Sequence, residues 1–184
     1  MNKSFLGLAI STLFMVGAAH ADVNPNDVSA TLSVTGSVTH EVNCAVNVGR
    51  SVVDLQSDIA KLAKQGDTGN ISSMQTVELS LSGDEECDSM AREGKITYSF
   101  HGTADSADGT SLANTDLSVG AAQGVGIALY NVNDNSILKI NQDKMIAQQS
   151  ISVNQLGLDL VKLNNQEVKA GSVQGSVTIQ IERL

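Results

Sequence analysis

The stretch Val28-Ser-Ala-Thr-Leu-Ser-Val-Thr-Gly-Ser-Val38 alternates without exception between apolar or small residues and polar ones. A period of two predicts an extended strand with one buried face and one hydrated face. Gly36 lies on the apolar face, although glycine weakens a strand interior and has no side chain to bury. Two interpretations stay open at this point: an ordinary first strand of a β-sandwich, or a strand that serves a neighbouring subunit.

The residues before this stretch have the pattern of a secretory signal peptide. Lys3 supplies a positive charge, residues 5–18 form an apolar run, and Ala19-His20-Ala21 places small residues before a cleavage point. The apolar run is shorter than the roughly 20 residues that a membrane helix needs. We therefore expect cleavage after Ala21 and an exported chain with no membrane insertion.

The composition argues against several classes of partner. The formal net charge of −9 disfavours nucleic acids and anionic membrane surfaces, which attract clustered Lys and Arg. After the signal peptide the aromatic residues are Tyr98, Phe100 and Tyr130, which gives weak support to a sugar-binding platform. Many Gly, Ser, Thr, Asn and Val residues are typical of short strands joined by polar turns.

The two cysteines, Cys44 and Cys87, predict one disulfide, because an even number of cysteines in an oxidising compartment usually pairs. Two free buried thiols are the alternative. A crosslink that closes a loop of this length stabilises a fold by about 4 kcal/mol in the chain-entropy model.

The rest of the chain predicts short strands at regular spacing and therefore an all-β sandwich or barrel in one domain. Ser57 is the expected N-cap of a helical turn within 57–64. Residues 83–88 and 102–120 are expected to be turns and loops, including a solvated turn at 105–109. The predicted strands are 42–48, 51–55, 75–82, 95–100, 125–130, 137–140, 150–153, 156–163 and 175–181.

The sequence predicts no catalytic, cofactor or metal site, and hence no enzyme. His40 and Glu41 lie close to Cys44, but zinc needs three or four converging ligands. The Gly-rich run 120–126 leads into a strand, whereas a phosphate-binding loop leads into a helix. A Gly-x-Ser-x-Gly nucleophile motif is absent from the sequence.

Several pieces follow one another in an order that resembles a known family. An alternating arm with a glycine precedes Cys44-Ala-Val46, and a short apolar segment at 52–55 and a helical stretch at 59–62 come next. A strand at 77–81 leads to Cys87, Gly124-Val-Gly-Ile-Ala-Leu129 follows, and an alternating segment at 170–181 ends the chain. This order, over nearly the whole mature chain, is similar to the chaperone–usher pilins, the subunits of type 1-like fimbriae.

The resemblance implies an incomplete immunoglobulin-like β-sandwich, the pilin fold, with an N-terminal donor-strand extension. The expected domains are a signal peptide at 1–21, a donor-strand arm at 22–38 and a pilin domain at 39–184. The arm would fill an apolar groove in the next subunit through strand addition. Its expected donor positions are Ala30, Leu32, Val34, Gly36 and Val38, and Gly36 would face a shallow pocket where exchange begins.

The resemblance also implies the partners: neighbouring pilin subunits in a homopolymer, a periplasmic chaperone and an outer-membrane usher. The expected function is that of a structural subunit, exported through the periplasm to a fimbrium on the bacterial surface, that polymerises by donor-strand exchange and supports adhesion. The alternatives are a minor or tip adhesive subunit, or a secreted immunoglobulin-like binding module. One departure is Arg183, which stands where the family often has a tyrosine that helps chaperone docking.

Overall fold

The computed structural model describes residue 35 and residues 41–69, 72–147 and 154–184. The chain divides into two units, 1–39 and 40–184, and the helices and strands named here belong to the second. None of the helices in the described residues is long and apolar enough to cross a membrane.

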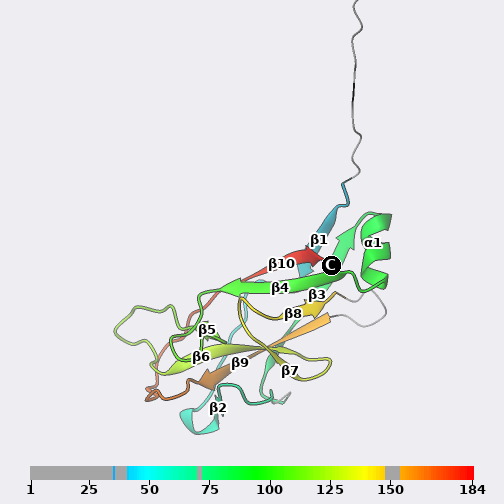
Figure 1. The fold of residues 1–184 in the computed structure, drawn as a ribbon. Helices are drawn as coiled ribbons and strands as arrows, with labels where there is room; N and C mark the ends of the chain where they lie inside the picture. Colours follow the sequence, from blue (N-terminus) through cyan, green and yellow to red (C-terminus); the bar gives the residue numbers. More distant parts are fainter. Residues whose placement is uncertain (1–34, 36–40, 70–71, 148–153) are drawn as a thin grey trace, which may run out of the picture. The chain divides into compact units, whose positions relative to one another are not determined.

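The larger sheet contains seven strands (Figure 1). Its main order is β1-β3-β9-β6-β5, in which every neighbouring pair is antiparallel. β2 adds to β9 in parallel, and β7 forms a hairpin with β6. The strands are β1 (Cys44–Val48), β2 (Ala63–Lys64), β3 (Gln75–Gly83), β5 (Leu112–Ala113), β6 (Val125–Asn131), β7 (Ser136–Leu138) and β9 (Asn154–Lys162).

The smaller sheet contains three antiparallel strands in the order β10-β4-β8. They are β4 (Ile96–Gly102), β8 (Lys144–Ile146) and β10 (Val177–Arg183). The long ladder between β10 and β4 runs from Val177 opposite Gly102 to Arg183 opposite Ile96. β10 is therefore held along one side by β4 and lies at an edge of its sheet.

The core lies between the two sheets and confirms the predicted all-β sandwich. Tyr98 and Phe100 of β4 are its large aromatic side chains, and both are almost fully buried. A smaller cluster around Tyr130 packs on the other face of β6. The aliphatic residues that complete the main core include Val77, Leu79, Ile96, Leu129, Ile140 and Leu156.

One α-helix, α1 (Glu85–Arg92), occupies the segment that the sequence predicts as a turn, so that prediction is wrong. The Asp84 side chain caps it by accepting a hydrogen bond from the N–H of Cys87 at 2.8 Å. Glu85, Glu86 and Asp88 lie in the first turn, where the helix dipole favours negative charge. The acidic run is thus a helix start and not a hydrated loop.

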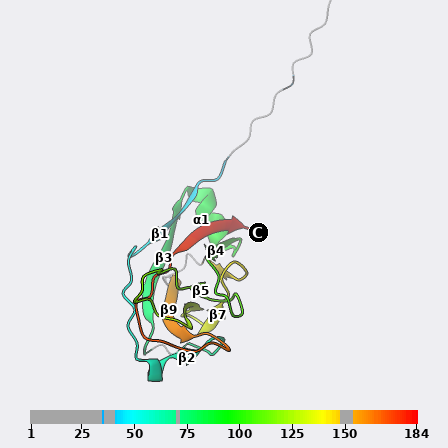
Figure 2. The same cartoon turned by 90° about the vertical axis from the view of Figure 1, so that its left-hand side faces the viewer.

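Other differences concern residues 51–61. A 3-10 helix, η1 (Ile59–Lys61), forms near the predicted helical turn, but its N-cap is Asp58 and not Ser57. Residues 51–55, predicted as a strand, have no strand pairing, and in Figure 2 the chain after β1 runs down one edge of the domain. The short β8 was not predicted, and the predicted strand 150–153 lies outside the described residues.

The predicted solvated turn at 105–109 is present, and Ser106 and Asp108 are exposed in it, but it is built around a carboxylate that is buried. Asp105 is 6% exposed. Its Oδ1 accepts the backbone N–H groups of residues 107–109 at 2.8 to 3.2 Å. Its Oδ2 accepts the N–H of Ser111 and the side-chain amide of Gln65, both at 2.8 Å. Burial raises the pKa of Asp105, but these donors outweigh burial and leave the pKa below its ordinary value.

Candidate functional site

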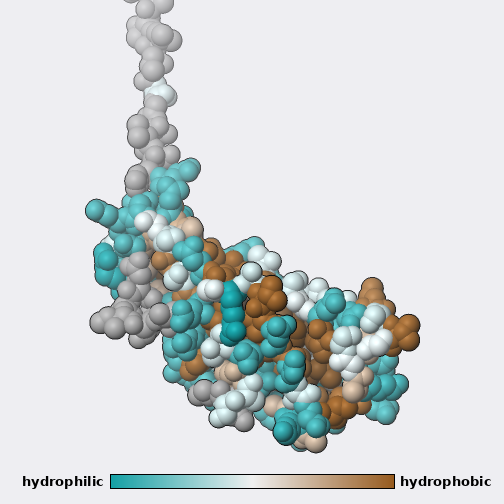
Figure 3. All heavy atoms as spheres, turned by 180° about the vertical axis from the view of Figure 1, so that it is seen from behind, coloured by the Kyte–Doolittle hydropathy of each residue, from teal (hydrophilic) through white to brown (hydrophobic). Residues whose placement is uncertain are grey.

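A groove between the two sheets, mainly apolar in its first part and more polar in its second, is the candidate site. It consists of two hollows of about 260 and 390 Å³ that share Val53 as a lining residue. The first hollow lies between residues 48–53 and β10, and the second continues beside residues 173–175. On the face drawn in Figure 3, apolar side chains form a band across the domain.

The floor of the groove is a row of buried aliphatic side chains. Leu156, Leu158 and Leu160 alternate along β9, so they lie on one face of that strand. Val77 and Ile127 extend this floor on the neighbouring strands β3 and β6. Residues two apart on a strand are separated by about 7 Å, which is also the spacing of side chains on one face of any strand laid into the groove.

The walls of the groove are apolar residues that the domain leaves partly uncovered. Val177 and Ile179 of β10 form one wall, and both are only half-buried. Val48 and Val53 form the other wall, and Val48 is 42% exposed. In a core closed on all sides these side chains would be buried, so the sandwich is open at this position.

Backbone pairing is also incomplete beside the groove. β1 and β10 are edge strands of different sheets, and among the described strands β10 pairs with β4 alone. The chain follows β3 as far as Gly49, whose N–H bonds to the carbonyl of Glu78 at 2.9 Å, and Arg50 donates to the carbonyl of Thr76. After Arg50 the chain makes no further strand pairing up to β2. An unpaired sheet edge beside an apolar groove is the arrangement that accepts an added strand.

The start of the domain lies at one end of this groove. The guanidinium of Arg183, at the end of β10, donates to the carbonyl of Val42. The disulfide joins Cys44, at the start of β1, to Cys87 in α1, with Cα atoms 5.7 Å apart. Asp84 adds a hydrogen bond from the N–H of Asn43 at 2.8 Å. These contacts fix the point at which residues before 41 join the domain.

The predicted site residues divide into two groups. The structure forms the disulfide that the sequence predicts between Cys44 and Cys87. The predicted donor positions Ala30, Leu32, Val34, Gly36 and Val38 lie outside the described residues. The groove residues themselves were not singled out from the sequence, because alternation at 175–181 signals a strand but not that its neighbour is missing.

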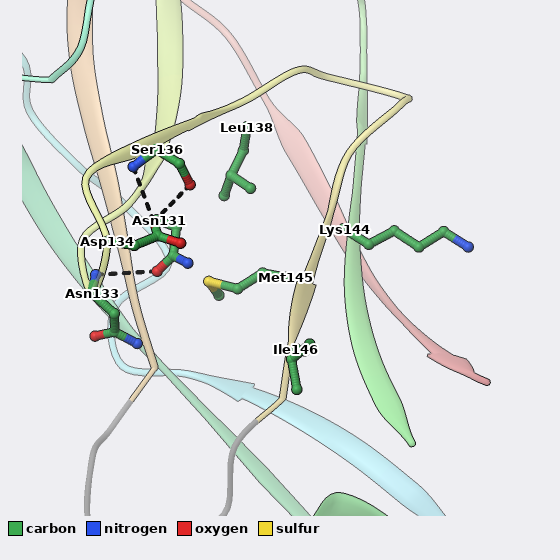
Figure 4. Close-up of a pocket in the computed structure, with 8 residues that line it drawn as sticks. All are labelled: Asn131, Asn133, Asp134, Ser136, Leu138, Lys144, Met145 and Ile146. Atoms are coloured by element: carbon green, nitrogen blue, oxygen red, sulfur yellow. Dashed lines mark hydrogen bonds between the residues drawn. The ribbon is translucent and has the colours of Figure 1, made fainter. Parts of the chain in front are cut away.

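A larger, polar hollow of about 630 Å³ lies beside the β6–β7 hairpin (Figure 4). Its polar groups are used locally: Asp134 accepts hydrogen bonds from the N–H and hydroxyl of Ser136, and Asn131 accepts the N–H of Asn133. Lys144 points away from the hollow and pairs with Glu182. Within the described residues, His, Cys, Asp and Glu form no group of three that could hold a metal ion.

Comparison with known proteins adds independent information. The chain matches the family described as "Fimbrial protein" over residues 32–182. It is similar to Long polar fimbria protein A of Salmonella typhimurium, with 28% identity over 136 residues that cover 74% of this chain and 71% of that protein. Among solved structures, the P pilus rod subunit PapA aligns with a TM-score of 0.47 and 13% identity, covering 83% of this chain and all of PapA.

Proposed function

The chain belongs to the fimbrial protein family, whose members are structural pilus subunits, and on that premise we propose that it polymerises by donor-strand exchange. In this proposal the arm at 22–38 of one subunit fills the apolar groove of the next. The open groove beside the edge strand β10 carries the proposal. A head-to-tail contact of this kind does not close on itself, so it produces a fibre.

The sequence of the arm suits the groove in both chemistry and length. The arm presents apolar or small residues at every second position from Ala30 to Val38. On the wall of the groove, odd positions from Val173 to Ile181 are likewise apolar or glycine. Each set spans eight residue steps, roughly 27 Å when extended. An arm of this length would cover the half-buried residues of β10 and the segment before it.

The arm is expected to run antiparallel to β10. The sheet β10-β4-β8 is antiparallel throughout, and antiparallel pairing is slightly more stable per residue than parallel pairing. This direction brings Gly36 toward Gly175. A Cβ atom on Gly175 would lie 2.8 Å from Cδ1 of Ile127, so the backbone of Gly175 packs closely against the floor of the groove at the position that Gly36 would face.

Export through the periplasm, a chaperone that protects the groove before assembly and an outer-membrane usher complete the proposal. An isolated subunit would expose the groove and the edge of β10, which is an aggregation hazard until another strand covers them. The surface fimbrium is the destination that the family implies.

The test is thermal unfolding of a shortened chain that begins at Val38, alone and with a synthetic peptide of residues 27–39. At a peptide concentration about 100 times its Kd, we expect the midpoint to rise by about 5–10 °C. The same peptide with Gly36→Leu is the matched control, and it should raise the midpoint much less because the larger side chain does not fit. A shortened chain that is stable alone and ignores both peptides would mean that the sandwich is complete and the proposal is wrong.

A further inference from the structure

The loop between β5 and β6 displays two aliphatic side chains to solvent. Leu117 is 97% exposed and Val119 is 110% exposed, the highest values among the large apolar side chains in the described residues. Single exposed apolar residues are common on protein surfaces. These two are separated by a single serine, so they form one small apolar projection, which we call the loop tip.

The loop that carries the tip is tied to the segment 172–174. The side-chain amide of Asn114 donates to the carbonyls of Ala122 and Ser172, both at 3.0 Å. Its Oδ1 accepts the N–H of Gln174 at 2.9 Å. The hydroxyl of Ser172 donates to Asp116, one residue before the tip. The tip is therefore held in place before any partner arrives, which lowers the entropic cost of binding.

The loop tip is also continuous with the groove. Gln174, to which the loop is bonded, lines the second hollow with Val173 and Gly175 at the end where β10 begins. In the proposed antiparallel arrangement, Val38 of the incoming arm lies at this same end. From Val38 to Glu41, where the described domain starts, three residues span at most about 10 Å. The body of the subunit that donates the arm must therefore sit against this end of the groove.

We propose that the loop tip, Leu117 and Val119, packs against the body of the neighbouring subunit whose arm fills the groove. The inference rests on the proposed donor-strand exchange and adds a second contact to it. The facing surface is the one around Val42 of the neighbour, where Arg183 meets the chain and Leu184 is 70% exposed. The contact thus joins apolar side chains at opposite ends of two copies of the same chain.

The first test measures the accessibility of position 117 in full-length subunits. Leu117→Cys is reacted with a water-soluble maleimide in purified fibres and in purified, unpolymerised subunit. We expect labelling to be about tenfold slower in fibres, because the position becomes buried in an interface. Asn133→Cys, an exposed position on the β6–β7 hairpin, is the matched control and should react equally in both states.

The second test measures the effect of the contact on the fibre. Leu117→Ser combined with Val119→Ser should leave unfolding of the monomer and binding of the 27–39 peptide unchanged, since both side chains face solvent. Fibres of this variant should dissociate at a lower temperature than wild-type fibres, and Leu117→Ile with Val119→Ile should restore wild-type behaviour. Free labelling at position 117 in fibres, or unchanged fibre stability, would overturn the inference alone. Wild-type subunits that bind no peptide and form no fibres would overturn the proposed function as well.

Discussion

At the scale of single residues, Asp105 shows how a polar side chain organises a loop. A carboxylate that accepts five hydrogen bonds compensates its own burial and holds residues 105–111 in a compact turn. Gln65 extends this network, because its Oε1 accepts the N–H of Asn164 at 3.2 Å. The Asp105 carboxylate therefore ties together loops that are distant in the sequence.

Asp105→Asn is expected to destabilise the domain by about 2–4 kcal/mol at neutral pH. The asparagine NH2 group would face N–H donors where the carboxylate accepts hydrogen bonds. Urea unfolding measures the loss, and Asp134→Asn is the control, since Asp134 is an exposed carboxylate with a similar local bond to Ser136. A control variant that loses as much stability as the Asp105 variant would contradict the buried network as the cause.

The loss of unfolding free energy caused by Asp105→Asn is expected to depend on pH. The folded-state pKa of Asp105 lies below its ordinary value, so its contribution to stability is present above the unfolded pKa of about 3.9 and is lost as pH falls through the folded value. The difference in unfolding free energy between wild type and Asp105→Asn should therefore shrink as the pH is lowered below about 4.

The role of a single residue could not be predicted from the sequence where its type is common in two different environments. Asp105-Ser-Ala-Asp-Gly109 has the composition of an exposed turn, and nothing local reveals that Gln65 and Ser111 bury its first carboxylate. Asp58 was missed as a cap for a similar reason, because Ser57 beside it is an equally good cap by type. The choice between neighbours depends on backbone angles that only the folded chain sets.

At the scale of elements, strands with one buried face could be predicted from the sequence. Elements whose formation depends on contacts with distant residues could not. The segments that became β3, β4, β6 and β10 all alternate or carry continuous apolar runs. Residues 51–55 have the same pattern but no backbone partner in the described chain, so they form a wall of the groove instead of a strand. α1 lacks long helical periodicity and depends on the Asp84 cap and the disulfide to Cys87.

Cys44→Ser is expected to reduce the unfolding free energy by about 4 kcal/mol, because the disulfide closes a loop between residues 43 positions apart. The yield of the subunit in the periplasm should fall accordingly. Chemical denaturation of the purified subunit measures the change. Cys87→Ser and the double variant should lose as much as the single variant, and unchanged stability in any of them would mean that the bond contributes nothing.

At the scale of the whole molecule, one set of residues forms the core of the domain and a different set lines the groove. The buried residues between the sheets hold the domain together, whereas the half-buried ones on β10 and at 48–55 line an open groove. The sequence predicted the sandwich directly, but it predicted a missing strand only through resemblance to the pilins. The absence of a strand leaves no pattern of its own in the residues that remain.

Ile179→Asn should weaken binding of the 27–39 peptide about tenfold or more while reducing monomer stability far less than a core substitution would. The reason is that Ile179 lies on a groove wall, which the arm would cover in the proposed assembly. Gln180→Asn is the matched control on the same strand, where the side chain is exposed. Titration of the peptide by calorimetry measures both, and equal affinities for the two variants would contradict the position of the arm against β10.

The placement of the disulfide has a mechanical consequence for a fibre assembled as proposed. Tension along such a fibre would enter each domain through the arm and reach Cys44 almost immediately. There the covalent bond to Cys87 would divert the load into α1 and β3. β1 could then not be peeled from the sheet one hydrogen bond at a time, and the pulling force would have to shear the sandwich as a unit.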